Sequence, residues 1–267
     1  MSSDWPTTVL SSTEEVFEVL ADLRGKRWLS RGQSCRYGGL VPSIDRDGRK
    51  TLTRLDKLML ERKSIDLFRS IARFFAGQGE QGALTSDVFA LMVLRHYGVP
   101  TRLLDWSRSP YVAAFFAAQR NETKDGEIWT FDEPRYEQEG VKQWIRWPET
   151  TTHDNAHQFF ADLTAFRLEE PPDWFVCQFY PADLSFPRQD AQAGAYSMTA
   201  RFGCDHADKI AELLTNDSQY HLYVLRAGLK LEVRRILRED HGVWLGSLYP
   251  DSAGAAMIAG SVFLSEA

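Results

Sequence analysis

The 267-residue sequence has few of the features that mark metal sites. Its three cysteines, Cys35, Cys177 and Cys204, are far apart and form no CxxC pair. This excludes the usual spacing of a zinc site and predicts reduced thiols. Cys35 could serve as a nucleophile, although a small buried or surface thiol is the more common outcome. We therefore expect no metal ion in this chain.

Long apolar runs and targeting patterns are absent as well. No apolar run reaches the roughly 18 residues needed to span a bilayer. Residues 1–6 lack the basic-then-apolar pattern of a signal peptide. Positive charge is in deficit, since the formal net charge is -6, which argues against broad binding to nucleic acid or anionic membrane while leaving room for a local basic groove. We expect a cytoplasmic protein with no membrane partner.

What the sequence does contain predicts one α+β domain. Of its residues, 43% are hydrophobic and 12% aromatic, as in globular proteins. Apolar residues at helical spacing predict helices over 53–75, 86–95, 110–120, 207–214, 229–238 and 252–258, after a first helix capped by Ser12. Strand patterns occur at 28–30, 127–131, 174–180, 194–198 and 221–225. Helices thus dominate the first half and strands the second, whereas residues 133–170 show weak periodicity and receive no element.

The most informative stretch is residues 95–107, RHYGVPTRLLDWS. Two arginines, a histidine, a tyrosine, an aspartate and a tryptophan stand just ahead of the apolar, alanine-rich segment 110–118. Buried arginine and aspartate cost several kcal/mol unless they are paired or used. The stretch therefore predicts either a ligand pocket or a buried ion-pair network.

Several arginines stand beside turns and polar partners, which suits an anion site. They are Arg31, Arg46, Arg102 and Arg188. Arg31 follows the strand expected at 28–30, and Gly32 would let a ligand approach the backbone closely. The alternative for Arg31 is an ordinary salt bridge with a neighbouring helix.

His96, Tyr97 and the segment Asp105–Ser107 are further candidates. The two rings are expected at a helix end, where a histidine can act as an acid or base or simply cap the helix. Asp105–Ser107 would offer a carboxylate, a ring and a hydroxyl at the start of the alanine-rich helix, where an anion or a capping carboxylate is favoured.

Asp105 is expected to be desolvated and kept charged by Arg31, Arg102 or His96. We expect five sequence-distant polar residues to converge on one cleft, because polar groups at the ends of elements can share a pocket. They are Arg31, His96, Arg102, Asp105 and Gln192.

Together these motifs resemble the bacterial FRG domain family, named for a phenylalanine-arginine-glycine motif. Ser30–Gln33, Leu40–Ser43 and Arg46 look like its Arg-Gly-Gln, Leu-x-Pro-Ser and Arg elements, with serine where the family prefers phenylalanine. Residues 96–106 are close to the family's His-Tyr-Gly-x-Pro-Thr-Arg-Leu-Leu-Asp-Trp. Two later groups are similar too: Arg188 with Gln192 and Gly194, and 248–251 with Gly254. The resemblance implies an FRG-like domain over 26–267, preceded by an N-terminal helix within 1–25.

A more distant likeness is to mono-ADP-ribosyltransferases, whose sites use Arg-Gly, then Ser-Thr-Ser and a Pro-x-x-Ala-x-x-Phe-Ala helix. Arg31–Gly32 and residues 105–117 look like these elements, with Asp105 and Trp106 replacing serine and threonine. The catalytic glutamate of those enzymes has no clean counterpart. Gln192 lies in the nearest comparable strand, but an amide cannot supply the negative charge. Asp105, or a carboxylate elsewhere that the sequence does not identify, would have to substitute.

The likeness implies an NAD-using ADP-ribosyltransferase-like enzyme, of the kind found among bacterial toxins and phage-defence effectors, with NAD as its substrate. The implied catalytic residues are Arg31, His96, Asp105 and Gln192. The implied ligand-binding residues are Gln33, Arg46, Tyr97, Arg102, Trp106, Ser107 and Arg188, with Trp106 stacking on the nicotinamide. Two alternatives stay open: a non-catalytic module for a nucleotide or other anionic ligand, and a nuclease or other hydrolase. No protein or nucleic-acid target is indicated.

Overall fold

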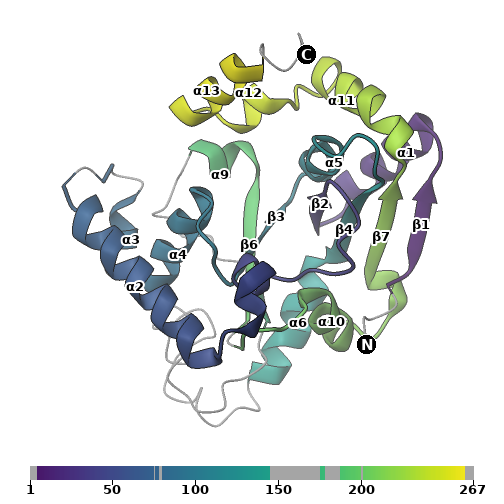
Figure 1. Cartoon of the computed structure of the whole chain (residues 1–267). Helices are drawn as coiled ribbons and strands as arrows, with labels where there is room; N and C mark the ends of the chain where they lie inside the picture. Colours follow the sequence, from purple (N-terminus) through teal and green to yellow (C-terminus); the bar gives the residue numbers. More distant parts are fainter. Residues whose placement is uncertain are drawn as a thin grey trace.

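A computed structural model describes residues 5–74, 76–77, 80–144, 175–177, 187–199 and 201–261 of the chain. Seven strands form one mixed sheet in the order β1-β7-β4-β2-β3-β6-β5 (Figure 1). They are β1 (Thr7–Leu10), β2 (Trp28–Gln33), β3 (Leu103–Ser107), β4 (Gly126–Asp132), β5 (Phe175–Cys177), β6 (Gly194–Thr199) and β7 (Tyr220–Leu225). Only β1 and β7 pair in parallel among these strands. The single sheet with its flanking helices confirms the α+β single-domain prediction.

The helices follow the predicted pattern closely. They are α1 (Thr13–Arg24), α2 (Arg54–Ala72), α3 (Gln81–Thr85), α4 (Asp87–His96), α5 (Pro110–Ala118), α6 (Glu133–Trp144), α9 (Pro187–Ala191), α10 (His206–Leu213), α11 (Lys230–Glu239), α12 (Leu245–Leu248) and α13 (Ser252–Ser261). The Ser12 side chain accepts a hydrogen bond from the Glu15 amide and caps α1, as predicted. No helix in the described part of the chain is long and apolar enough to cross a membrane.

Different helices cover the two faces of the sheet (Figure 1). Helices α1, α5 and α11 share one apolar core, which includes Val112. Helices α6 and α10 border another, which includes Trp129. Helices α2 and α4 pack beside β3 and β6 in a third core, which includes Leu91. The ends of β2, β3 and β6 are thus surrounded by helices on several sides.

The predicted division into a helix-rich first half and a strand-rich second half holds only roughly. Strands β1 to β4 all lie before residue 133, and β1 pairs with β7 at Thr7↔Leu222. The stretch that received no element begins with α6. Its remainder, from residue 145 to 170, lies outside the described residues. So does most of the strand expected at 174–180, of which β5 covers 175–177.

The buried face of α2 is partly ionic. Glu61 accepts hydrogen bonds from the Arg102 guanidinium at 2.5 to 3.0 Å, and Lys57 donates to Asp45 at 2.6 Å. Residues four apart share a helix face, so Lys57 and Glu61 point inward together. Leu55 of the same helix is 65% exposed, although it is apolar.

Candidate functional site

A cavity of about 500 Å³ lies where β2, β3 and β6 meet α4, α5 and the residue that follows α12. This volume falls within the range of small-molecule sites. Five arginines line it: Arg31, Arg46, Arg95, Arg120 and Arg188. Asp105 is the one carboxylate among the described residues of its wall. A concave wall with surplus positive charge favours an anionic ligand.

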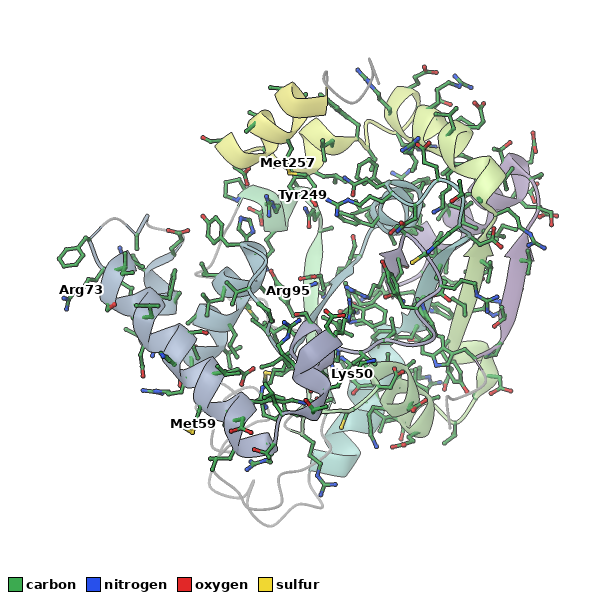
Figure 2. The ribbon with its side chains drawn as sticks, in the orientation of Figure 1. Lys50, Met59, Arg73, Arg95, Tyr249 and Met257 are labelled. Carbon is green, nitrogen blue, oxygen red and sulfur yellow. The ribbon has the colours of Figure 1, made fainter. Side chains whose placement is uncertain are left out.

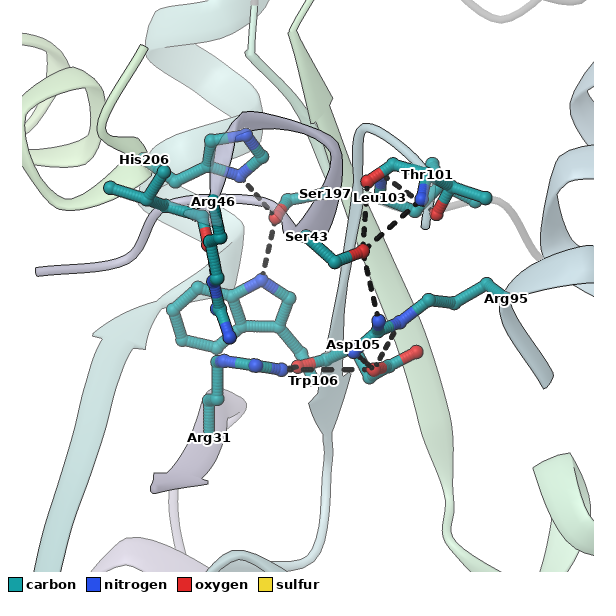
Figure 3. Close-up of polar contacts among 11 residues, drawn as sticks. Arg31, Ser43, Arg46, Arg95, Thr101, Leu103, Asp105, Trp106, Ser197 and His206 are labelled. Carbon is teal, nitrogen blue, oxygen red and sulfur yellow. Dashed lines mark hydrogen bonds and ion pairs between the residues drawn. The ribbon is translucent and has the colours of Figure 1, made fainter. Parts of the chain in front are cut away.

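Asp105 stands at the centre of this wall, between two guanidinium groups (Figure 3). Arg95 donates to its Oδ2 from Nε at 2.9 Å and from Nη2 at 2.7 Å. Arg31 Nη1 lies 3.8 Å from the same oxygen and donates to the Asp105 backbone carbonyl at 2.5 Å. Arg95 Nη1 donates in turn to Ser43 Oγ at 3.3 Å. The three charged side chains therefore hold one another in fixed positions.

Burial and neighbouring charges set the ionisation of this group. Burial lowers the pKa of Arg31 to about 10, and Asp105 opposes that shift. Burial alone would raise the pKa of Asp105, but Arg95 and Arg31 outweigh it and hold that pKa below its ordinary value. The Asp105 side chain is surrounded by protein atoms yet keeps 44% of its surface exposed, because it faces the cavity. Both groups are therefore charged at neutral pH.

A second group of side chains lies beside α12 and the start of α13. Arg188 donates from Nη1 to the His96 carbonyl at 2.8 Å and places Nη2 3.4 Å from Asp251. Its guanidinium lies 4.2 Å from the ring centroid of Tyr249, which Figure 2 labels next to α12. Burial and the charge of Arg188 lower the pKa of His96, which leaves that imidazole neutral at pH 7. Asp251 also accepts from the Gly254 amide at 2.7 Å, as expected for the N-cap of α13.

The segment that supplies β2, α4 and β3 is similar to a known family. Residues 26–126 match the family model of the FRG domain. The match covers less than half of the chain. No curated protein and no solved structure matches the chain. The FRG match holds Arg31, Arg46, Arg95 and Asp105, whereas Arg188 enters the cavity from beyond it.

Most of the residues singled out in the sequence lie around the cavity. Those in its wall are Arg31, Gln33, Arg46, His96, Asp105, Trp106, Ser107, Arg188 and Gln192. Arg102 and Tyr97 are absent from it, and the expectation that Arg102 joins the cleft and pairs with Asp105 is wrong. Arg102 stands three positions before Asp105, and side chains alternate along an extended chain, so it points away into the pair with Glu61. Tyr97 is 64% exposed and donates to Glu80.

Asp105 also differs from expectation in its secondary structure. It lies within β3, where it is paired with Tyr196 of β6, and not at the start of the alanine-rich helix. The N-cap of α5 is Ser109, whose side chain accepts from the Val112 amide. The Asp105 carboxylate therefore does not cap α5, and it faces the cavity.

The aromatic candidate Trp106 is held in place by contacts within the protein. Trp106 is 3% exposed, packs edge-on against Phe131 and donates from Nε1 to Ser197 Oγ at 2.8 Å. Ser197 Oγ lies 2.8 Å from His206 Nδ1 (Figure 3). Both Ser197 and His206 are completely buried, so this serine–histidine pair positions the indole and meets no substrate. Little of the Trp106 ring is left to stack on a nicotinamide.

Gln192 and Ser107 are tied to one another and to α12. Ser107 Oγ donates to the Gln192 carbonyl at 2.6 Å. Gln192 Nε2 donates to the Leu248 carbonyl at 3.0 Å. Gln192 lies in the turn before β6, where the sequence suggested a strand. Gln33 is likewise held, by the Gly39 carbonyl and Glu127.

Gly32 has a role that the sequence reading missed. A Cβ on Gly32 would lie 1.9 Å from the Ala113 carbonyl oxygen and 2.7 Å from the Ala117 nitrogen. The glycine thus admits helix α5 to the surface of β2. It also lines the cavity beside Arg31.

The sequence reading also missed several wall residues, namely Arg95, Arg120, Tyr196 and Tyr249, as ligand contacts. Arg95 stands directly before the FRG motif, and the helix expected over 86–95 could have placed it one turn from the site. Arg120 has no local motif. Only the crossing of α5 over β2 brings it to the cavity.

Replacing Asp105 by asparagine should destabilise the protein, because Arg95 and Arg31 lose their counterion. A fully buried pair broken on one side costs about 3–5 kcal/mol. The 44% exposure of Asp105 lowers our expectation to roughly 1–2 kcal/mol. Because the folded-state pKa of Asp105 is lowered, this stability is present above the unfolded aspartate pKa of about 3.9 and is lost as pH falls through the folded value. Urea unfolding of both proteins at pH 7 and pH 3 measures the difference, and equal stability at pH 7 would contradict the pairing.

Proposed function

We propose that the chain binds an anionic nucleotide, with NAD as the expected ligand, in the cavity around Arg31. The observation that supports this most is the charge of the wall. Arg31, Arg46 and Arg95 share one carboxylate of the wall, Asp105, so two positive charges on this side of the cavity remain unmatched. Arg31 Nε is buried without a hydrogen-bond partner. Unsatisfied buried donors are costly and mark sites where a ligand supplies the missing partner.

The side chains around Arg31 suit a phosphate joined to a ring. Arg46 uses Nε on the Val41 carbonyl at 2.6 Å, which leaves its Nη atoms toward the rim beside Tyr37. Planar guanidinium groups bind phosphate oxygens in pairs. Tyr37 is 58% exposed and offers a ring face there, and Phe116 and Val112 add apolar surface to the wall.

ADP-ribosyl transfer or NAD hydrolysis is the second candidate, favoured by an ionised Asp105 that faces the cavity. In hydrolysis the bond between the ribose C1′ and the nicotinamide nitrogen breaks, and that electron pair leaves with nicotinamide. Water adds to C1′ and releases one proton, which gives ADP-ribose. A carboxylate near C1′ would stabilise the positive charge of the transition state. Such consumption of NAD would suit a toxin or phage-defence effector.

Binding ranks above catalysis because of how Asp105 is held. Arg95 donates two hydrogen bonds to the same Oδ2, and this pairing weakens the field that Asp105 can direct at a ribose. The Gln192 side-chain amide donates a hydrogen bond to the Leu248 carbonyl and is therefore also engaged by the protein. A nuclease or other hydrolase is a weaker proposal, because its candidate acid or base, His96, is already in contact with protein groups. His96 Nε2 lies 3.9 Å from Asp251, and the His96 backbone carbonyl accepts a hydrogen bond from Arg188.

Thermal melting with and without nucleotide tests the binding proposal. A ligand that binds only the folded state stabilises it by RT ln(1 + [L]/Kd), about 2.7 kcal/mol at a hundredfold excess over Kd. We expect NAD and ADP-ribose at millimolar concentration to raise the melting temperature by several degrees, whereas adenosine, which has no phosphate, should not. Free nicotinamide in the NAD sample, measured by chromatography, would establish the second candidate. Unchanged melting with all three compounds would refute the binding proposal.

A further inference from the structure

A second pair of arginines lies beside Tyr249, on the same cavity. Arg188 stacks on the Tyr249 ring at 4.2 Å. The charges of Arg188 and Arg120 both act on the Tyr249 hydroxyl. Phe116 lies edge-on to the same ring, with centroids 6.5 Å apart. Arg120, Phe116, Tyr249 and Arg188 thus form one neighbourhood, which we call the Tyr249 side of the cavity. Arg31, Arg46, Arg95 and Asp105 form the Asp105 side.

We propose that the Tyr249 side is a second anion subsite, so that a nucleotide carrying a second phosphate apart from its first binds more tightly than one with a single phosphate or diphosphate group, such as NAD. This inference rests on the proposed nucleotide-binding function and narrows its ligand class. Arg31 and Arg46 would hold the first phosphate. Arg120 and Arg188 would hold the second.

Charge matching supports two subsites. On the Asp105 side, three arginines face one carboxylate, so two positive charges have no negative partner in the wall. On the Tyr249 side, Arg120 and Arg188 line the cavity, and Asp251, 3.4 Å from Arg188, offsets one of their two positive charges. A diphosphate linkage would satisfy the first surplus only, whereas a separate phosphate monoester adds roughly 1.5 to 2 negative charges at pH 7.

The donors on the Tyr249 side are available for such a group. Arg188 uses both Nη atoms on the protein, but its Nε is buried without a partner. Arg120 is exposed, and its guanidinium makes no hydrogen bond or ion pair with the described residues. Its backbone carbonyl is fixed by Lys230 at 2.9 Å. A phosphate drawn between Arg120 and Arg188 would satisfy both and still leave the Tyr249 ring for the nucleoside.

Calorimetric titration with AMP, ADP and adenosine 3′,5′-bisphosphate tests the second subsite. ADP has two adjacent phosphates, and the bisphosphate has two separated ones. We expect the bisphosphate to bind at least about tenfold more tightly than ADP or AMP. Arg120→Gln should remove that tenfold advantage and leave AMP affinity within about twofold of the unmodified protein. Arg73→Gln, an exposed arginine outside the cavity, is the matched control and should change neither affinity.

The outcomes separate the inference from the function on which it rests. Equal affinity for the three compounds would overturn the second subsite and leave nucleotide binding standing. A tightly bound bisphosphate that is insensitive to Arg120→Gln would overturn its assignment to Arg120. A folded protein that binds none of the three at millimolar concentration would overturn both proposals.

Discussion

Replacing Gly32 by alanine is expected to destabilise the chain by about 3 kcal/mol or more. The added Cβ would lie 1.9 Å from the Ala113 carbonyl oxygen and 2.7 Å from the Ala117 nitrogen. Both contacts are backbone atoms of α5, so no side-chain rotation relieves them. Helix α5 would have to move away from β2 and open the core that it shares with α1 and α11. Urea unfolding followed by circular dichroism measures the loss.

Gly48→Ala is the matched control. A Cβ on Gly48 meets nothing within 4 Å, so this change should alter the free energy of unfolding by no more than about 0.5 kcal/mol. If Gly32→Ala were as stable as Gly48→Ala but had lost its affinity for nucleotide, Gly32 would serve the ligand and our assignment of it to helix packing would be wrong.

Replacing Arg31 by lysine is expected to weaken nucleotide binding about 10- to 100-fold with little change in stability. Lysine can keep the positive charge and the bond to the Asp105 carbonyl. It cannot offer a second, coplanar donor to a phosphate, and a hydrogen bond to a charged group is worth about 1.5–3 kcal/mol. Calorimetric titration with ADP-ribose measures the affinity.

Urea unfolding provides the control for Arg31→Lys, since a misfolded variant would also fail to bind. Arg24→Lys changes an arginine that lies outside the cavity wall and should bind like the unmodified protein. An Arg31→Lys variant with unchanged affinity would mean that the guanidinium geometry of Arg31 plays no part in binding.

Local patterns in the sequence were sufficient to predict most elements of the fold. Ser12 and Pro110 stand at helix starts as capping rules require. The strands predicted at 127–131 and 221–225 are present as β4 and β7. Local patterns failed where a distant segment decides the outcome. Leu55 has helical spacing but is exposed, because α2 buries its ionic row against Arg102 and Asp45.

The candidate site shows the same division between local and distant information. The dense polar stretch 95–107 predicted either a ligand pocket or a buried ion-pair network. The structure has a cavity, which Asp105 lines, and a buried ion pair, which Arg102 forms with Glu61. The sequence could not assign which arginine pairs with Asp105. The pairing depends on which face of β3 is turned toward α4. In the structure Asp105 faces Arg95 of α4, and Arg102 points the other way. Arg120 and Tyr249 reach the cavity only through the packing of α5 and α12 around it.

The central claim is that the cavity beside Asp105 binds an anionic nucleotide through Arg31. A crystal structure of the full chain grown with ADP-ribose tests it most directly. We predict phosphate oxygens within hydrogen-bond distance of the Arg31 or Arg46 guanidinium, with the Arg95–Asp105 pair intact beneath them. A folded chain whose cavity stays empty at saturating ADP-ribose, or that holds the ligand on another surface, would contradict the claim.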